Sequence, residues 1–333
     1  MIKIGLIGCG FMGSMHSACY SVIEGVEVVA VADVRPEKAA EIAKNHPGCK
    51  IYSTGMELIE NEKVDAVDIC LPTFLHAEHA IAAMRAGMNV FVEKPVARTL
   101  AEGEEMIRVE KETGKMVQVG LVIRSWNEYM WLKENYDAGK FGKILCANFT
   151  RLSSRPTWGW ESWLDNPDRS GTAALDLHIH DVDFVRYLMG EPTGLYSRAG
   201  RNADGLLEHI STVFDYNGAA VTVEGGWGYP AAFPFTAVFR VVCEKCVVVL
   251  GGDGLHVYWN DGTDEKVEVK EEFQGNNNAG GNLSSLGGYY NELKYFVGCL
   301  TTGSKNTRAP LDDSVKSLAL VLNEIELAGG CKI

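Results

Sequence analysis

The chain has 333 residues, of which 46% are hydrophobic and 23% are charged, so it is long enough to form two domains, each with its own core. A formal net charge of -13 and a pI near 5.1 argue against nucleic acid or an anionic membrane as a partner, because both require a basic protein face. An anionic cofactor stays compatible with this charge, since a few backbone N–H groups suffice to bind a phosphate.

The start of the chain and its cysteines predict a cytoplasmic protein. A buried strand is expected directly at residues 2–7, and no signal-peptide features precede it. No segment reaches the roughly 18 consecutive apolar residues that a membrane helix requires. The nine cysteines are odd in number and scattered, which is typical of free thiols in a reducing compartment.

The first third of the chain alternates apolar runs with helical patterns. Strands are predicted at 2–7, 27–33, 65–70, 89–93 and 116–120, and helices near 12–23, 36–45, 75–86 and 99–113. This alternation with short connections is typical of a parallel sheet that helices cover on both faces. We therefore predict an α/β protein that begins with a doubly wound Rossmann domain over residues 1–122.

The pattern changes after residue 122. Helices are expected near 126–137, 173–189, 289–301 and 312–328, and strands at 143–152, 194–201, 207–216, 219–227, 235–243, 246–250 and 255–259. Turn pairs such as Asn217-Gly218 separate the strands, as hairpins require. Residues 123–333 should therefore form an α+β domain with a large, mostly antiparallel sheet. Helices would cover one face of this sheet, and an uncovered apolar face would form the interface of a homodimer or homotetramer.

Two segments of this second half allow alternative interpretations. Residues 274–288 are rich in Gly, Asn and Ser, and are expected to form a surface loop that could also act as a lid or a dimer contact. Cys243 and Cys246 have the CxxC spacing of a zinc or redox site, but their β-branched flanks favour two strands joined by a Glu-Lys turn. No second pair of ligands lies nearby in the sequence, so no metal site is predicted.

A glycine motif, Gly8-Cys9-Gly10-Phe11-Met12-Gly13, follows the first strand and opens a helix. The next strand ends in Asp33, in the context of a dinucleotide-binding fingerprint, where the glycines let the backbone approach a pyrophosphate. Asp33 would accept hydrogen bonds from the adenosine ribose and repel a 2′-phosphate, so NAD is favoured over NADP. Arg35 weakens this preference, because an arginine there can pair with a 2′-phosphate.

The segment 91–97, FVEKPVA, places a charged pair between an apolar strand and a proline. Ligands of parallel sheets bind at the carboxyl ends of the strands, so Lys94 should project toward the reactive end of the cofactor. Pro95 restrains the residue before it to extended backbone geometry, which helps to hold the lysine. The alternative is that Glu93 and Lys94 form a surface pair that caps the strand.

A second cluster of polar residues, Asp176-Leu177-His178-Ile179-His180-Asp181-Val182-Asp183, lies at the predicted start of a helix. Asp176 and His180 would share a face, with Asp183 beside His180 and His178 pointing roughly the opposite way. A histidine paired with a carboxylate can take up a proton near neutral pH, as alcohol oxidation requires. Two other interpretations are part of a metal-hydrolase signature and a polar helix cap.

Further residues accompany these motifs in a recognisable order: His16, Leu71-Pro72-Thr73-Phe74-Leu75-His76, Ala86-Gly87, Trp163-x-Asp165 and Ser170-Gly171. Together they resemble the glucose–fructose oxidoreductase / inositol dehydrogenase / MocA (Gfo/Idh/MocA) family of NAD(P)-dependent oxidoreductases. The resemblance covers most of the chain and weakens in the C-terminal sheet.

The resemblance implies a Rossmann domain followed by an α+β domain whose sheet supports the substrate and commonly forms the dimer interface. It implies that Lys94, Asp176 and His180 face the nicotinamide and the substrate, and that the Lys94–Pro95 peptide is cis. Two departures bear on the substrate. Gly171-Thr172-Ala173 stands where the family has three glycines, and His178 stands where many members have a small residue.

The resulting hypothesis is NAD-dependent oxidation of a secondary alcohol on a polyol, inositol or sugar. His180 would take the hydroxyl proton, Lys94 would donate a hydrogen bond to the same oxygen, and Asp176 would orient His180 or bind a neighbouring hydroxyl. Which of Lys94 and His180 is the base stays open. The same scaffold also hosts redox-neutral NAD-dependent glycosidases and catalytically silent sugar sensors, and a reductase working in the opposite direction is equally compatible.

The expected site falls into three sets of residues and contains no metal ligand. The catalytic set is Lys94, Asp176 and His180. The cofactor-binding set is Gly8, Gly10, Phe11, Met12, Gly13, Asp33, Arg35, Pro72, Thr73, His76, Glu93 and Lys94. The substrate-binding set is Lys94, Arg124, Trp158, Trp163, Asp176 and His180, with Trp160 as a further wall residue.

Overall fold

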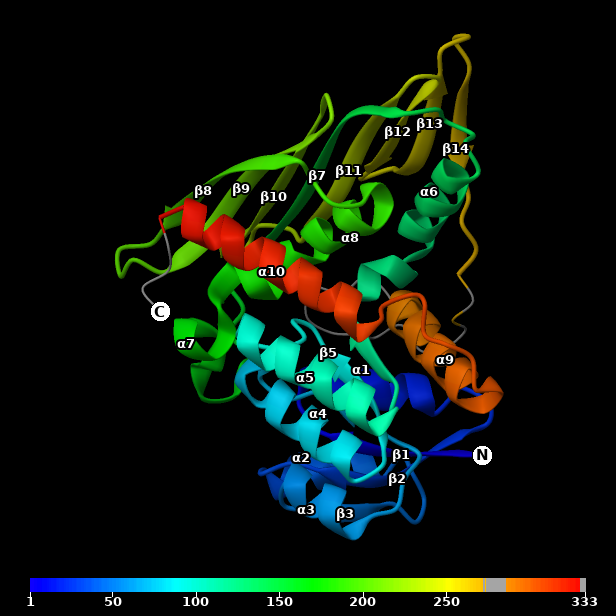
Figure 1. The fold of residues 1–333 in the computed structure, drawn as a ribbon, viewed down its shortest axis with the longest axis vertical. Helices are drawn as coiled ribbons and strands as arrows, with labels where there is room; N and C mark the ends of the chain where they lie inside the picture. Colours follow the sequence, from blue (N-terminus) through cyan, green and yellow to red (C-terminus); the bar gives the residue numbers. More distant parts are fainter. Residues whose placement is uncertain (272, 274–285, 330–333) are drawn as a thin grey trace.

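The computed structural model describes residues 1–271, 273 and 286–329, and it contains two β-sheets, one from each half of the chain (Figure 1). The loop predicted at 274–288 therefore lies almost entirely outside the described residues. Within the described part of the chain, no helix is long and apolar enough to cross a membrane. Buried apolar side chains form one continuous core that runs through both halves.

The first sheet has six parallel strands in the order β3-β2-β1-β4-β5-β6. Their bounds are β1 (Ile2–Ile7), β2 (Val26–Ala32), β3 (Lys50–Tyr52), β4 (Ala66–Ile69), β5 (Asn89–Glu93) and β6 (Val117–Gly120). This is the strand order of a Rossmann fold, in which the direction of winding reverses between β1 and β4. The short edge strand β3 was not predicted, because three largely exposed residues show no usable periodicity.

Five α-helices belong to this half: α1 (Phe11–Tyr20), α2 (Pro36–Ala43), α3 (Gly55–Asn61), α4 (His76–Arg85) and α5 (Leu100–Thr113), and a 3-10 helix, η1 (Thr73–Leu75), precedes α4. The bounds of α5 could be predicted from the sequence because both of its ends have clear capping residues. Thr99 and Glu102 form a reciprocal capping box at its start, and Gly114 adopts a left-handed conformation with φ 65° at its end. Helix α3 was missed because it is only seven residues long. The predicted doubly wound α/β fold is confirmed.

The second sheet has eight strands in the order β14-β13-β12-β11-β7-β10-β9-β8. Their bounds are β7 (Ile144–Ser154), β8 (Gly194–Arg201), β9 (Leu207–Tyr216), β10 (Ala219–Tyr229), β11 (Thr236–Cys243), β12 (Cys246–Gly251), β13 (Gly254–Trp259) and β14 (Asp264–Val267). All neighbours are antiparallel except β7 and β10, so the sheet is mostly antiparallel as predicted. The CxxC segment joins β11 to β12, which confirms the hairpin interpretation.

The helical segments of the second half are η2 (Val122–Ser125), α6 (Asn127–Asp137), η3 (Trp160–Asp165), α7 (Pro167–Ser170), η4 (Ala174–His178), α8 (Ile179–Met189), α9 (Gly287–Thr302) and α10 (Leu311–Leu327). The single helix predicted at 173–189 is therefore corrected, because its first part, η4, is a π-helical turn. Strand β10 passes close to this turn. A Cβ atom at Gly225 would lie 2.7 Å from Cβ of His178, so only glycine permits the approach.

The last two helices return to the first half of the chain. Helix α9 packs on α1 and β1, and α10 packs on α5, α8 and β8. Figure 1 shows α6, α8 and α10 on the side of the second sheet that faces the first domain. Large apolar side chains are exposed on strands of this sheet, namely Leu145, Tyr196, Val213 and Tyr258. The pairing of two chains through the second sheet stays a prediction.

Candidate active site

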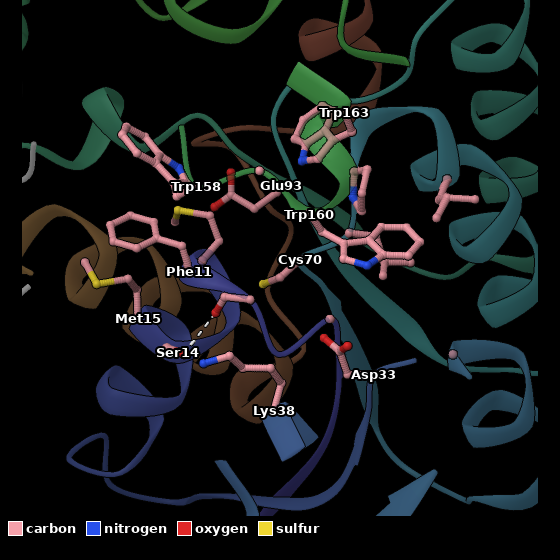
Figure 2. A pocket seen from close by; sticks show the side chains of 18 of the residues that line it. Phe11, Ser14, Met15, Asp33, Lys38, Cys70, Glu93, Trp158, Trp160 and Trp163 are labelled. Atoms are coloured by element: carbon pink, nitrogen blue, oxygen red, sulfur yellow. Dashed lines mark hydrogen bonds between the residues drawn. The ribbon is translucent and has the colours of Figure 1, made fainter. Parts of the chain in front are cut away.

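A cavity of about 910 Å³ lies at the carboxyl ends of β1, β2, β4 and β5 (Figure 2). This volume is near the upper end of the roughly 300–1,000 Å³ that ligand sites usually have. One wall comes from the loop after β1 and from α1, and the opposite wall comes from residues 158–164, η4 and α8. The cavity therefore lies between the two halves of the chain, at the point where the winding of the first sheet reverses.

The glycine loop after β1 forms part of the wall of this cavity. Gly10 precedes α1 and has no side chain to cap the helix, and the first turn contains no acidic residue. Gly8 has φ +94°, and a Cβ atom at Gly13 would lie 1.9 Å from the Gly8 carbonyl oxygen, so both positions require glycine. Phe11 and Met12 line the cavity, while Gly13 supports the wall from behind. Uncapped N–H groups at a helix start attract anions, so the loop fits the pyrophosphate of NAD.

Asp33 lies at the end of β2, where it was predicted, but its carboxylate is already paired. Arg35 donates from Nε to Oδ1 and from Nη2 to Oδ2, both at 3.0 Å, and the Cys9 backbone N–H donates to Oδ2 at 2.8 Å. Burial would raise the pKa of Asp33, but the hydrogen bonds from Arg35 and Cys9 lower it below its usual value. Lys38 also lines this end and was missed by the sequence analysis (Figure 2). The preference for NAD over NADP stays a prediction.

Of the three residues predicted to bind the cofactor after β4, one lies on the cavity wall and two lie behind it. Pro72 lines the cavity, whereas Thr73 and His76 are buried outside its lining. The His76 ring lies 2.8 Å from the Pro95 carbonyl oxygen through Nδ1 and 2.7 Å from the Leu71 carbonyl oxygen through Nε2. His76 thus ties this loop to the one after β5, and its position favours a supporting role.

Lys94 and Asp176 meet at the cavity and connect the two halves of the chain. Lys94 follows β5, and its peptide bond to Pro95 is cis, which confirms that prediction. Its Nζ donates to Oδ1 of Asp176 at 2.8 Å and to the Asp176 backbone oxygen at 2.5 Å. The two side chains are 14% and 24% exposed, so the pair is sheltered but open to a ligand. Asp176 was expected to orient His180 or bind a substrate hydroxyl, and here it holds Lys94.

His180 lines the same cavity from α8 and is 8% exposed. Its Nδ1 has no hydrogen-bond partner among the described residues. Burial lowers the pKa of His180 well below its usual value, and the positive charges of Lys94 and Arg151 lower it further. The ring is therefore neutral at neutral pH and is able to accept a proton.

Arg124 does not line the cavity, which corrects its prediction as a substrate-binding residue. It is buried, and it donates from Nε and Nη2 to the two carboxylate oxygens of Asp183 at 2.7 and 2.6 Å. Both oxygens of Asp183 are therefore engaged by Arg124, and Ser317 Oγ also donates to Oδ1 at 2.6 Å. His178 does point elsewhere, as predicted, and its Nε2 lies 2.9 Å from Oε1 of Glu324. These residues tie helices together and contribute nothing to the cavity wall.

Three tryptophans form part of the cavity wall that comes from the second half of the chain. Trp158, Trp160 and Trp163 all line the cavity, and they come from the connection between β7 and α7 (Figure 2). The ring of Trp158 packs against Phe11, with 6.0 Å between the ring centroids. Aromatic faces pack well on the apolar faces of sugar rings, so the arrangement agrees with the predicted substrate wall.

Several lining residues had no signal in the sequence. Ser14 and Met15 follow the glycine motif on α1, where a helical pattern does not show which side faces a ligand. Tyr289 reaches the cavity from α9, which is remote in the sequence. Only the packing of α9 on α1 places Tyr289 at the site.

Because His180 is buried and neutral, the free energy of unfolding should depend on pH. The unfolded chain protonates this histidine below a pKa of about 6.5, whereas the folded chain resists protonation. The stabilisation is therefore complete above about pH 6.5 and is lost as the pH falls below it. Between about pH 7 and pH 5, the free energy of unfolding of the wild type should fall by up to about 2 kcal/mol more than that of His180→Asn. Urea unfolding at both pH values measures this difference, and equal losses would contradict a buried neutral His180.

Two family models match the chain over most of its length. Residues 2–121 match the oxidoreductase family with an NAD-binding Rossmann fold, and residues 129–249 match the Gfo/Idh/MocA C-terminal domain. The matches confirm the expected NAD-binding domain and the family resemblance of the domain that follows it.

Curated relatives and solved structures agree with these matches. Myo-inositol 2-dehydrogenase of Thermotoga maritima is 34% identical over 190 residues, which is 57% of this chain and 55% of that protein. The match thus spans little more than half the length of this relative. Inositol 2-dehydrogenase 4 of Saccharopolyspora erythraea is 30% identical over 264 residues, 76% of this chain and 74% of that protein.

Solved structures extend the likeness to nearly the whole chain. A levoglucosan dehydrogenase in complex with NADH and levoglucosan superimposes with a TM-score of 0.86 at 24% identity, covering 98% of this chain and 97% of that one. Myo-inositol 2-dehydrogenase from Lactobacillus plantarum does so with a TM-score of 0.79 at 26% identity, with the same coverage. The fold, the matched domains and the relatives together show that this chain belongs to the Gfo/Idh/MocA family of NAD-binding oxidoreductases.

Proposed function

We propose that the protein is an NAD-dependent dehydrogenase that oxidises a secondary alcohol of a polyol, inositol or sugar. The observation that carries the proposal is the Lys94–Asp176 ion pair, which shares the cavity with the neutral His180. A proton acceptor and a hydrogen-bond donor in one sheltered site are what alcohol oxidation requires of a protein. The glycine loop at the other end of the cavity supplies the place for the cofactor.

The cofactor and the chain divide the chemistry between them. Bound NAD supplies the hydride acceptor. His180, whose neutral ring carries a lone pair, accepts the proton of the substrate hydroxyl. Lys94 donates a hydrogen bond to the same oxygen and stabilises the negative charge that develops there. Asp176 keeps the ammonium group of Lys94 in the cavity through the 2.8 Å contact.

The cavity wall supports a ring-shaped polyol as the substrate class. The three tryptophans offer flat apolar surfaces, while Lys94, Asp176 and His180 offer polar groups on the same cavity. A cyclic sugar or inositol has both an apolar face and a rim of hydroxyl groups, so it matches both features. The names of the relatives, inositol 2-dehydrogenases and a levoglucosan dehydrogenase, point to the same class.

The test is formation of NADH, followed spectroscopically, when NAD is offered with inositols, levoglucosan, aldoses, sugar acids and amino-sugar nucleotides. We expect net NADH with one of these groups and its loss in His180→Asn. Hydrolysis of a glycoside without net NADH would instead establish a redox-neutral glycosidase. Binding of NAD and a sugar with no turnover at all would establish a sensor.

A further inference from the structure

A cluster of buried ionisable residues lies behind the cavity wall. His16 on α1, Asp68 on β4, Glu93 on β5 and Glu292 on α9 come from four separate elements, and none is more than 4% exposed. Glu93 also lines the cavity, as Figure 2 shows. The function proposed above assigns no role to His16, Asp68 or Glu292.

Direct contacts connect this cluster to Lys94. His16 Nδ1 lies 2.9 Å from Oδ2 of Asp68, and Nε2 on the other side of the ring lies 3.1 Å from Oε1 of Glu93. The second carboxylate oxygen of Glu93, Oε2, accepts a hydrogen bond from the backbone N–H of Lys94 at 3.0 Å. The imidazole thus links Asp68 to Glu93, and Glu93 reaches the backbone at the base of the lysine side chain.

The charges explain why the imidazole stands between the two carboxylates. A neutral imidazole carries a proton on one nitrogen only and would turn a lone pair toward one carboxylate. An imidazolium carries a proton on both nitrogens, and its positive charge compensates part of the buried negative charge on both sides. Burial would lower the pKa of His16, but Asp68 and Cys70 raise it well above its usual value. Burial and the nearby Glu93 raise the pKa of Glu292 in the same cluster well above its usual value.

Packing leaves the Glu93 side chain little freedom to move on its own. A Cβ atom at Gly120 on β6 would lie 3.1 Å from Oε1 of Glu93, so the glycine makes room for the carboxylate. The ring of His16 is held in turn by an edge contact with Phe91, with 5.4 Å between the centroids. Contacts on several sides therefore define the position of Glu93, and the contact with His16 is the charged one among them.

We propose that His16 is a positioning residue for Lys94: it holds the Glu93 carboxylate, which fixes the backbone of Lys94 and so aims Nζ at Asp176 and the substrate. The inference rests on the function proposed above, because it assigns Lys94 to the substrate oxygen. It adds a buried residue of α1, outside the cavity wall, to the machinery that orients Lys94.

The test compares His16→Gln with His178→Gln. His178 is an equally buried histidine that pairs with a glutamate at 2.9 Å, but it has no contact with Lys94. Glutamine keeps a polar side chain and removes the imidazole in both variants. We expect His16→Gln to lower kcat about 100-fold with little change in KM, because a small displacement of a catalytic group has effects of that size. His178→Gln should keep nearly the wild-type kcat, although both variants lose stability.

A second measurement does not depend on the reaction. The rate at which an amine-directed acylating reagent modifies Lys94, followed by mass spectrometry, reports how firmly Nζ is held. We expect acylation to be several-fold faster in His16→Gln and unchanged in His178→Gln. If the wild type oxidises no alcohol but this contrast appears, the proposed function fails while the positioning role stands. If both histidine variants behave alike in kcat and in acylation, the positioning role is overturned.

Two further observations decide the remaining possibilities. In the double variant His16→Gln/Glu93→Gln, kcat should be no lower than in Glu93→Gln alone, because His16 acts through Glu93. Additive losses of kcat in the double variant would contradict this.

If His16→Gln does not fold, Asp68→Asn provides a substitute, because it weakens the contact that holds the His16 ring. This variant should show the same faster acylation of Lys94. A stoichiometric metal ion in the purified protein would also overturn the proposal, since His16, Glu93 and Glu292 present three ligand atoms within 4.8 Å of one another.

Discussion

Lys94→Met is expected to lower turnover about 1,000-fold while leaving the affinity for NAD nearly unchanged. Methionine keeps the length of the side chain but removes the ammonium group, so the substrate oxygen loses its hydrogen-bond donor. The fold should persist, because the Asp176 side chain is 24% exposed and can turn to water when its partner is removed. Steady-state kinetics with the substrate found in the NADH assay, and binding of NAD followed by tryptophan fluorescence, measure the two quantities separately.

Lys133→Met provides the matched control for this experiment. Lys133 also forms an ion pair, with Asp137 at 2.6 Å, and is similarly sheltered, with its side chain 18% exposed, but it lies on α6 and does not line the cavity. Its removal should leave turnover unchanged. If Lys94→Met retained turnover within roughly tenfold of the wild type, Lys94 would have no direct part in the chemistry, because a positioned proton-transfer group usually contributes 10²–10⁴-fold.

The second large effect concerns stability. Arg124→Met is expected to lower the free energy of unfolding by about 3–5 kcal/mol, because it leaves the buried carboxylate of Asp183 without its partner. The arginine side chain is 1% exposed, and Asp183 is fully buried. Arg124 also contacts Asp313 at 2.8 Å and the Arg308 carbonyl oxygen at 2.7 Å, so η2, α8 and α10 all lose an anchor. Urea unfolding of both proteins measures the change.

The same variant tests the location of Arg124 relative to the site. The turnover of the folded fraction should match that of the wild type, because Arg124 lies outside the cavity lining. If Arg124→Met raised KM without changing the free energy of unfolding, Arg124 would contact the substrate after all.

Arg108→Met serves as the control for removal of a charge. Arg108 pairs with Glu105 and Glu112 on the exposed side of α5, and its loss should hardly change the stability.

The first domain was predictable because its signals are local. Buried parallel strands appear as continuous apolar runs, and the glycine motif lies between β1 and α1 at a spacing that the geometry of the turn requires. In a parallel sheet, residues just after the strands gather at one edge, so Asp33 and Lys94 could be placed there from sequence alone. The elements that were missed, β3 and α3, are too short to establish a period.

The limits of the sequence are clearest for charged residues. Arg124, Asp183 and His178 are residue types common in active sites, yet each has its partner on another buried element. Helical spacing placed Asp183 beside His180, but the spacing takes no account of Arg124, which engages the carboxylate of Asp183. Whether a charge serves an ion pair or a ligand depends on contacts between residues distant in the sequence, and a single sequence does not contain them.

The sequence by itself determined the Rossmann architecture, the antiparallel second sheet, the glycine loop and the motifs around Lys94 and His180. These follow from periodicity, turn chemistry and short-range spacing, all of which act within about one strand–helix unit. Tertiary structure alone decided that Asp176 holds Lys94, that Tyr289 reaches the cavity from α9, and that His16 stands between Asp68 and Glu93. The physical reason is that these contacts join elements distant in the sequence, and the energy of a buried charge depends on which neighbours the fold brings to it.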